Sequence, residues 1–178
     1  LQEKGMEVPT TWEEVLEVAK AFYNPDERMY GIALPTSESA FTEQVFSQFA
    51  LSNGANVFNG DKEVTVNTPE MKEAMEFYKE LASYSMPGST EVADVNDAFV
   101  AKNAPMAMYS TYILGNVEKE GFAEDLALVL PNKKSEAAYG CVVVLGIAAG
   151  MEEAETEAAK KFVSYMLEEE NNVKWLNM

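Results

Sequence analysis

Two tyrosines and a serine stand close together at the expected junction between a strand and a helix. Tyr109 ends an apolar run that begins at Met106, and Ser110 and Tyr112 lead into a short helix that we expect to continue through Val117. Aromatic rings bind the apolar C–H faces of sugars, and hydroxyl groups bind sugar hydroxyls. The first turn of a helix adds free N–H donors, and α/β proteins bind ligands at the ends of strands. This chemistry predicts a site for a hydroxyl-rich small molecule, in which Tyr112 stacks on the ligand and Tyr109 or Ser110 hydrogen-bonds to it.

Tyr109 also has a purely structural interpretation, in which its ring only completes the buried face of its strand. Ferric-ion binding through Tyr109 and Tyr112 is a further alternative for a binding protein. Such sites favour adjacent tyrosines and often recruit histidine, and the sequence contains no histidine. Ferric ion, or another small solute, therefore stays open as an alternative to a sugar.

Catalytic and metal-dependent functions have little support in the composition. The lack of histidine and the presence of one cysteine, Cys141, exclude Cys/His zinc sites, His-based catalysis and an internal disulfide. Glycoside hydrolysis needs two suitably placed carboxylates, and the sequence singles out no such pair. We therefore predict a protein that is not an enzyme and needs no cofactor or metal. A glycoside hydrolase and a pure interaction domain are the alternatives.

The net charge of the chain is strongly negative. Its 178 residues carry 30 Asp and Glu against 13 Lys and Arg, which gives a formal charge of −17. Such a surface repels phosphate groups over about 8 Å, the Debye length at physiological salt, so nucleic acid is not an expected partner. With 47% hydrophobic residues the chain can still bury an ordinary core. No apolar run approaches the ~20 residues that span a bilayer.

Helices and short apolar segments alternate along the sequence, which is typical of a layered α/β fold. Helix-start signals stand at Thr11, where Glu14 completes a capping box, and at Thr68, which Pro69 follows. Apolar residues at three- and four-residue steps predict helices at 12–22, 41–52, 69–82, 95–102, 110–117 and 152–169. Short apolar runs predict strands at 30–34, 64–66, 106–109, 126–130 and 141–149.

The same three- and four-residue steps predict which face of each helix is buried. In the helix that follows Thr68, the expected buried residues are Met71, Ala74, Met75, Tyr78, Leu81 and Ala82. In the last helix they are Ala158, Ala159, Phe162, Val163, Met166 and Leu167. Both helices are therefore expected to contribute to a core.

Several motifs occur in an order that is similar to one known family. They are Pro9–Glu14, Tyr30–Ala33, Ser52–Phe58, Val64–Glu70, Ala98–Met108, Tyr109–Tyr112, Ala138–Gly140 and Ala158–Met166. Together they resemble the extracellular solute-binding proteins of ABC importers, of the maltose-binding, carbohydrate-binding type. Tyr112 and Leu51 stand where many relatives have tryptophan or another aromatic residue. A site smaller or more polar than that of the long-oligosaccharide binders is therefore expected.

That resemblance implies an α/β fold like the type II periplasmic binding proteins, in which two lobes close around a ligand. Residues 1–132 would form most of the C-terminal lobe. Residues 133–178 would be a crossover strand and a helix that pack on the N-terminal lobe, which is missing because both ends are expected to be cut from a longer chain. The crossover piece is then expected to pack on an unusual surface or on a second copy, and the chain alone to bind sugar weakly or not at all.

Further ligand contacts are implied by the same resemblance. Glu38, Phe41 and Gln44 lie at a loop-to-helix junction where the family contacts its ligand, and their types suit hydroxyl recognition. Tyr139 and Gly140 match another contact region, where glycine permits close approach of the backbone to a ligand. The expected partners are a small carbohydrate and an ABC transporter permease. The expected location is extracellular or periplasmic, with a lipoprotein anchor in the membrane.

Overall fold

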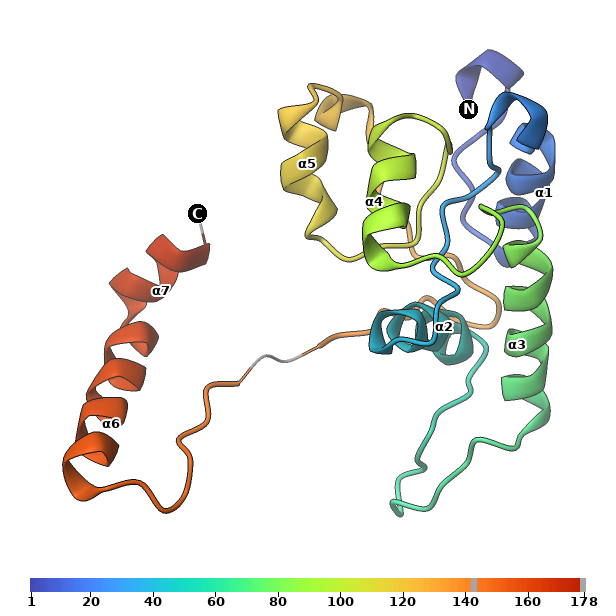
Figure 1. The fold of residues 1–178 in the computed structure, drawn as a ribbon. Coiled ribbons are helices and arrows are strands. Elements are labelled where there is room, and N and C mark those ends of the chain that lie inside the picture. Colours follow the sequence, from blue (N-terminus) through green and yellow to red (C-terminus); the bar gives the residue numbers. More distant parts are fainter. Residues whose placement is uncertain (142–143, 177–178) are drawn as a thin grey trace. The chain divides into compact units, whose positions relative to one another are not determined.

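A computed structural model describes residues 1–141 and 144–176 of the chain (Figure 1). The chain folds as two compact units, Leu1–Tyr139 and Gly140–Met178. The sequence-based division lay after Asn132. The first unit extends further, to Tyr139, and therefore includes the segment 133–139. The first unit contains η1 (Gln2–Lys4), α1 (Trp12–Phe22), η2 (Pro25–Glu27), α2 (Ala40–Ser52), α3 (Pro69–Ala82), α4 (Val92–Val100), α5 (Ile113–Lys119) and η3 (Ala123–Asp125). The second contains α6 (Glu153–Leu167) and α7 (Glu169–Leu176).

Local sequence signals explain where the main helices begin. The Thr11 side chain accepts the N–H of Glu14 at 3.3 Å, and the Glu14 carboxylate accepts the N–H of Thr11 at 3.1 Å, which completes the predicted capping box of α1. Thr68 caps α3 by accepting the N–H of Met71, and Pro69 occupies the first turn. These starts are confirmed, because capping depends only on residues within one turn of the helix.

The predicted strands are only partly realised. Ala33 and Ala107 form a parallel bridge, in which the Ala33 N–H donates to the Met106 carbonyl at 2.8 Å and the Met108 N–H donates to the Ala33 carbonyl at 3.0 Å. The segments 30–34 and 106–109 therefore lie side by side. In the described part of the chain, however, strand pairing is limited to isolated bridges.

The strands expected at 64–66, 126–130 and 141–149 need correction. Val64 forms one antiparallel bridge with Phe58, and the described residues of the other two segments form no strand. Leu128 and Val144 are 70% and 78% exposed instead of buried. A strand needs a neighbouring edge for its N–H and C=O groups, and among the described residues no such edge pairs with the segments 126–130 and 141–149. Residues 142 and 143 of the last segment lie outside the described residues.

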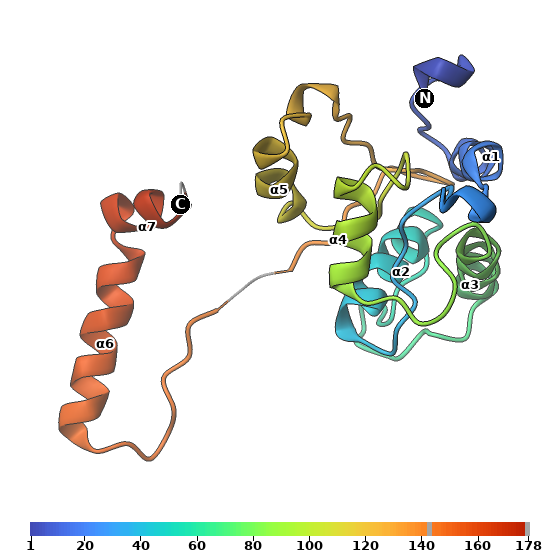
Figure 2. The ribbon, with the colours of Figure 1, turned by 45° about the horizontal axis from the view of Figure 1, so that its top comes forward.

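The core of the first unit forms where α1, α2 and α3 meet the segment 30–34 (Figures 1 and 2). Ile32 and Leu34 pack into this cluster, while Ala33 packs on the other side with Val95 and Ala98 of α4. Adjacent side chains of an extended segment point to opposite faces, so one segment joins both clusters. The segment 30–34 thereby links the three-helix core to α4.

Gly31 allows α1 to lie directly on this segment. A Cβ atom at this position would lie 2.0 Å from the backbone oxygen of Ala19 in α1, far inside van der Waals contact. The Tyr30-Gly31 motif therefore has a packing role, because only glycine leaves room for the helix backbone.

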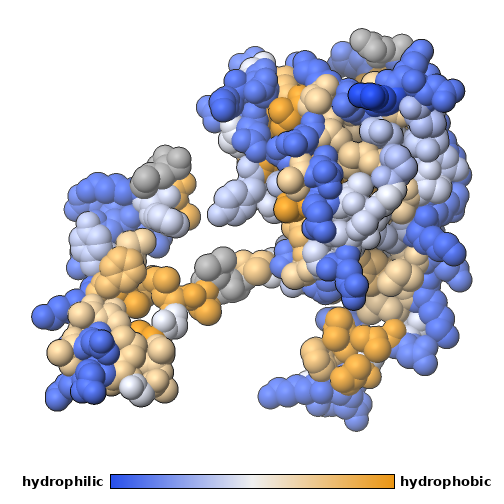
Figure 3. Space-filling view, in the orientation of Figure 1, coloured by the Kyte–Doolittle hydropathy of each residue, from blue (hydrophilic) through white to orange (hydrophobic). Residues whose placement is uncertain are grey.

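The second unit has no buried residue among those that the structure describes in it. α6 and α7 contact each other, but Phe162 and Leu167 are 57% and 65% exposed, and Figure 3 shows hydrophobic side chains on the visible surface of this unit. The buried face predicted for the last helix is therefore wrong for this chain, because a helix cannot cover its own apolar face. Met75 of α3, also predicted as core, is 52% exposed.

Candidate functional site

Phe41 and Tyr109 are in direct ring contact. Phe41 lies in the first turn of α2, and Tyr109 ends the segment 106–109; their ring centroids are 5.1 Å apart with an interplanar angle of 61°. Tyr109 also packs against the cluster of Ala33 and Val95, as its structural interpretation expected. Burial raises the pKa of the Tyr109 hydroxyl, and the nearby Asp97 carboxylate raises it further. The hydroxyl therefore stays protonated at neutral pH and can donate a hydrogen bond.

The loop before α2 is held in place by buried hydrogen bonds. The Tyr78 hydroxyl donates to the Pro35 carbonyl at 2.5 Å, and the Thr90 hydroxyl donates to the Leu34 carbonyl at 2.7 Å. Burial raises the pKa of Tyr78 strongly, so its hydroxyl remains a donor. Ser39 ends the loop by accepting the N–H of Thr42 at the start of α2. These contacts fix the position of the α2 N-terminus and hence that of Phe41.

One face of α2 extends from this ring pair to the segment that closes the first unit. Phe41, Gln44 and Gln48 share this face because residues three, four and seven apart lie on one side of a helix. Gln48 is 9% exposed, its Nε2 donates to the Ala137 carbonyl, and its Oε1 accepts the N–H of Tyr139 at 2.7 Å. The segment that contains Tyr139 therefore lies along α2.

Sequence reasoning did not identify Gln48. Its signal was a polar residue between Val45 and Phe49 on an apolar helix face, where a buried side chain must find hydrogen-bond partners. The sequence could have shown that Gln48 needs partners. It could not have shown that Ala137 and Tyr139 supply them.

The remaining predicted site residues are less closely grouped. Glu38, Ser110 and Tyr112 are exposed, with the Tyr112 side chain 88% exposed, and the Ser110 hydroxyl accepts the N–H of Tyr112 at 3.4 Å. Tyr139 is 40% exposed beside α2. Gly140 is the first residue of the second unit. The structure thus joins Phe41 to Tyr109 and places Tyr139 beside Gln48, while Tyr112 and Glu38 are open to solvent.

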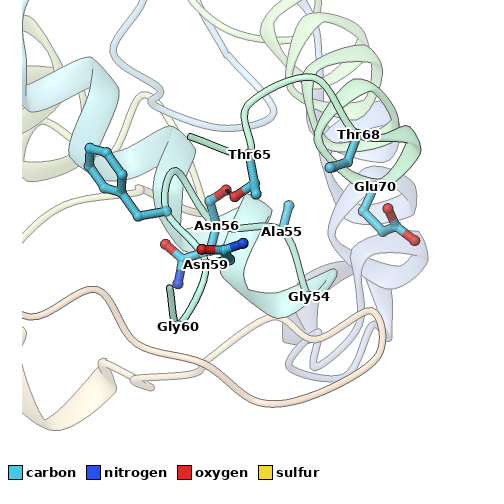
Figure 4. Close-up of a pocket in the computed structure, with 9 residues that line it drawn as sticks. Gly54, Ala55, Asn56, Asn59, Gly60, Thr65, Thr68 and Glu70 are labelled. Carbon is cyan, nitrogen blue, oxygen red and sulfur yellow. Dashed lines mark hydrogen bonds between the residues drawn. The ribbon is translucent and has the colours of Figure 1, made fainter. Parts of the chain in front are cut away.

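Two surface pockets in the first unit are lined by other residues. The first, of about 350 Å³, lies at the turn after α2 and is lined by Gly54, Ala55, Asn56, Phe58, Asn59, Gly60, Thr65, Thr68 and Glu70 (Figure 4). Asn59 Oδ1 accepts the N–H groups of Asp61 and Glu63, and the Thr65 hydroxyl donates to the Asn56 carbonyl. These polar groups therefore serve the turn itself.

The second pocket, of about 470 Å³, lies beside α4. Its lining residues are Tyr30, Met86, Pro87, Ser89, Thr90, Asp94, Asp97, Ala98, Ala101 and Asn103. Asp94 already accepts the N–H of Glu91 in the cap of α4. None of the residues predicted to contact a ligand lines either pocket.

Within residues 1–141 and 144–176, no His, Cys, Asp and Glu side chains gather in a group that could hold a metal ion. In the same described ranges, no helix is both long and apolar enough to cross a membrane.

Two proteins of known sequence are among those similar to this chain. It is 48% identical over 178 residues to the putative ABC transporter periplasmic-binding protein YcjN of Escherichia coli (strain K12), which covers 100% of this chain and 41% of that protein. It is 27% identical over 165 residues to the maltotriose-binding protein of Pyrococcus abyssi (strain GE5 / Orsay), covering 89% of this chain and 35% of that protein. The chain therefore spans less than half the length of either relative.

Among solved structures, three ABC transporter solute-binding proteins have a fold similar to this chain. The protein from Thermotoga lettingae TMO, bound with alpha-D-tagatose, has a TM-score of 0.76 at 21% identity. This match covers 96% of this chain and 45% of the chain of that protein. The protein from Agrobacterium radiobacter K84, in complex with ribitol, has a TM-score of 0.75 at 20% identity. This match covers 97% of this chain and 46% of the chain of that protein. The protein from Agrobacterium vitis S4, with bound D-mannitol, has a TM-score of 0.73 at 22% identity. This match covers 95% of this chain and 43% of the chain of that protein.

These likenesses confirm the solute-binding-protein fold that the sequence motifs implied. A family model for bacterial extracellular solute-binding proteins matches residues 1–178, and this chain therefore belongs to that family.

Proposed function

We propose that this chain is part of a binding protein that captures a sugar or a polyol and delivers it to an ABC importer without catalysis. Family membership and the relatives that carry tagatose, ribitol, mannitol or maltotriose in their names support this ligand class. The observation that carries the proposal is the contact between Phe41 and Tyr109. It joins an aromatic surface to a protonated hydroxyl at the end of paired extended segments, and a sugar or polyol can use both groups.

Each predicted site residue has a role in this proposal. Tyr112, with its exposed ring, stacks on a C–H face of the ligand, and Tyr109 or Ser110 hydrogen-bonds to a hydroxyl. Glu38 and Gln44 lie next to Phe41 on the loop and helix and bind further hydroxyls.

A second contact region completes the proposed site. Tyr139 contributes from beside α2, and Gly140 allows the ligand to approach the backbone.

The ligand is held, in this proposal, between two lobes. The first unit, which extends to Tyr139, forms most of the C-terminal lobe, and the chain beyond it crosses to the N-terminal lobe. The exposed apolar side chains Val144, Leu145, Phe162 and Leu167 support this arrangement, because they need a covering surface. A ligand that contacts both lobes favours the closed form, and closure signals the loaded state to the permease.

Location follows from the same proposal. Membership of a bacterial extracellular family supports a periplasmic or extracellular protein. A lipoprotein anchor would keep it close to the permease in the membrane.

Calorimetric titration tests the function. The complete two-lobed protein and this chain alone are titrated with tagatose, ribitol, mannitol and maltotriose. We expect micromolar or tighter binding of at least one compound by the complete protein, and weak binding or none by the chain. Submicromolar binding by the chain alone would contradict the two-lobed site.

Three other results would replace the proposed ligand class or activity. A charge-transfer colour on addition of ferric ion would identify a metal carrier. Turnover of aryl glycosides would identify an enzyme. Failure of the complete protein to bind any sugar or polyol would favour an interaction domain.

A further inference from the structure

Gln48 presents its carboxamide to the backbone of a single segment. Its Nε2 donates to the Ala137 carbonyl and its Oε1 accepts the Tyr139 N–H at 2.7 Å. A carbonyl can only accept and a backbone N–H can only donate, so these two partners define the orientation of the amide. The side chain thus pairs with residues i and i+2 of the segment, as a neighbouring strand would.

Further contacts hold the same segment one helical turn along α2. The N–H groups of Lys134 and Ser135 donate to the Ser52 carbonyl at 3.0 and 3.1 Å. Ser52 follows Gln48 by four residues and so lies on the same side of α2. The segment is therefore docked at two successive levels of the helix, and Gln48 holds the end from which the chain leaves the first unit.

The face of α2 that holds this segment also bears the proposed ligand contacts. Gln44 and Phe41 precede Gln48 by four and seven residues, and Phe41 contacts the ring of Tyr109. Tyr139, whose N–H Gln48 accepts, is itself a proposed contact. The position of Tyr139 relative to Phe41 therefore depends on the Gln48 amide.

We propose that Gln48 is a positioning residue that fixes the last segment of the first unit, residues 134–139, and thereby tightens ligand binding. This inference rests on the proposed function. Gln48 acts through Tyr139 and the backbone, not by touching the ligand. With the segment already held, less conformational freedom is lost when a ligand is bound. A loosened segment would lose this conformational freedom each time a ligand binds, which weakens binding, and the ligand would dissociate faster.

Amide hydrogen exchange on this chain tests the contact without any ligand. Gln48→Met keeps the size of the side chain but removes both hydrogen bonds. We expect the Tyr139 N–H to exchange roughly tenfold faster, with the amides of α3 unchanged. Gln48→Glu keeps an acceptor for the Tyr139 N–H, so this amide should stay more protected than in the Met variant. Ser47→Ala, on the same helix, serves as the matched control and should leave the Tyr139 amide as in the wild type.

Stopped-flow measurement of ligand release from the complete protein tests the consequence. With the sugar or polyol that the wild type binds, we expect Gln48→Met to raise the dissociation rate several-fold, and Ser47→Ala to leave it unchanged. If Gln48→Met frees the Tyr139 amide but leaves release unchanged, Gln48 is only structural and the inference is wrong. If the Tyr139 amide keeps its protection in Gln48→Met, Gln48 does not hold the segment and the inference is also wrong. Failure of the wild type to bind any sugar or polyol would overturn the proposed function, and the exchange rates would still decide whether Gln48 holds the segment.

Discussion

The indole ring of Trp12 stacks on the ring of Phe77, with centroids 4.5 Å apart and an interplanar angle of 21°. Trp12 is the first residue of α1, and Phe77 lies in α3. The ring of Phe49 in α2 lies nearly perpendicular to the indole, with ring centroids 5.8 Å apart. The indole N–H donates to the Ser52 hydroxyl at 2.9 Å. A single side chain therefore joins the three helices that form the core.

Replacement of Trp12 should cost more stability than any exposed substitution. Trp12 is 1% exposed, so Trp12→Ala leaves a cavity and removes one of the hydrogen bonds of the Ser52 hydroxyl, and we expect a loss of about 3–5 kcal/mol in the free energy of unfolding. Met75→Ala, at a residue 52% exposed, should change it by less than about 0.5 kcal/mol. Urea denaturation followed by circular dichroism measures both values. A loss below about 1 kcal/mol for Trp12→Ala would show that this contact does not organise the core.

Gly31→Ala should force α1 away from the segment 30–34. The added methyl group would lie 2.0 Å from the Ala19 oxygen, and backbone atoms cannot yield as a flexible side chain can. We expect a loss of about 1–3 kcal/mol or failure to fold. Gly60→Ala is the control, because an added Cβ there meets nothing within 4 Å. Equal melting temperatures for the two variants would contradict the close packing.

Glu14 should contribute to the acid sensitivity of the fold. The Thr10 N–H donates to its carboxylate at 2.7 Å, and this bond, with those from the Thr10 hydroxyl and the Thr11 N–H, holds the pKa of Glu14 below its ordinary value of 4.5. A pKa that is lower in the folded state adds stability above the ordinary pKa, and this stability is lost as the pH falls through the folded-state pKa. Glu14→Gln should therefore reduce the difference in urea midpoint between about pH 7 and about pH 3. Glu17→Gln, outside the capping box, should retain the wild-type difference, and an unchanged difference in Glu14→Gln would refute the assignment.

Tyr112→Ala should weaken binding without weakening the fold. The side chain is 88% exposed, so its loss removes little packing from the free protein. In the complete protein we expect the binding free energy of the sugar or polyol to weaken by roughly 0.5–1.5 kcal/mol. Phe58→Ala removes another exposed aromatic ring, outside the proposed site, and should leave affinity unchanged. Calorimetry measures affinity, thermal denaturation checks stability, and equal affinity of the two variants would remove Tyr112 from the site.

The sequence predicted α1, α2 and α3 well, because their signals are local, whereas α4 and α5 each begin three residues away from the expected start. The capping residues Thr11 and Thr68 act within one turn of the helix that each begins. The order of short motifs also predicted the fold that the solved structures confirm. Both kinds of information are present in neighbouring residues and need no knowledge of distant contacts.

The partners of the site residues were decided only by the tertiary structure. Periodicity placed Phe41 and Tyr109 at the ends of their elements, but their ring contact and the bonds from Gln48 to Ala137 and Tyr139 join segments far apart in the sequence. Hydrophobicity likewise indicated that Phe162 should be covered, without indicating by what, and the structure shows it exposed. A residue's own chemistry states what it needs, and only the folded chain determines which distant group, if any, supplies it.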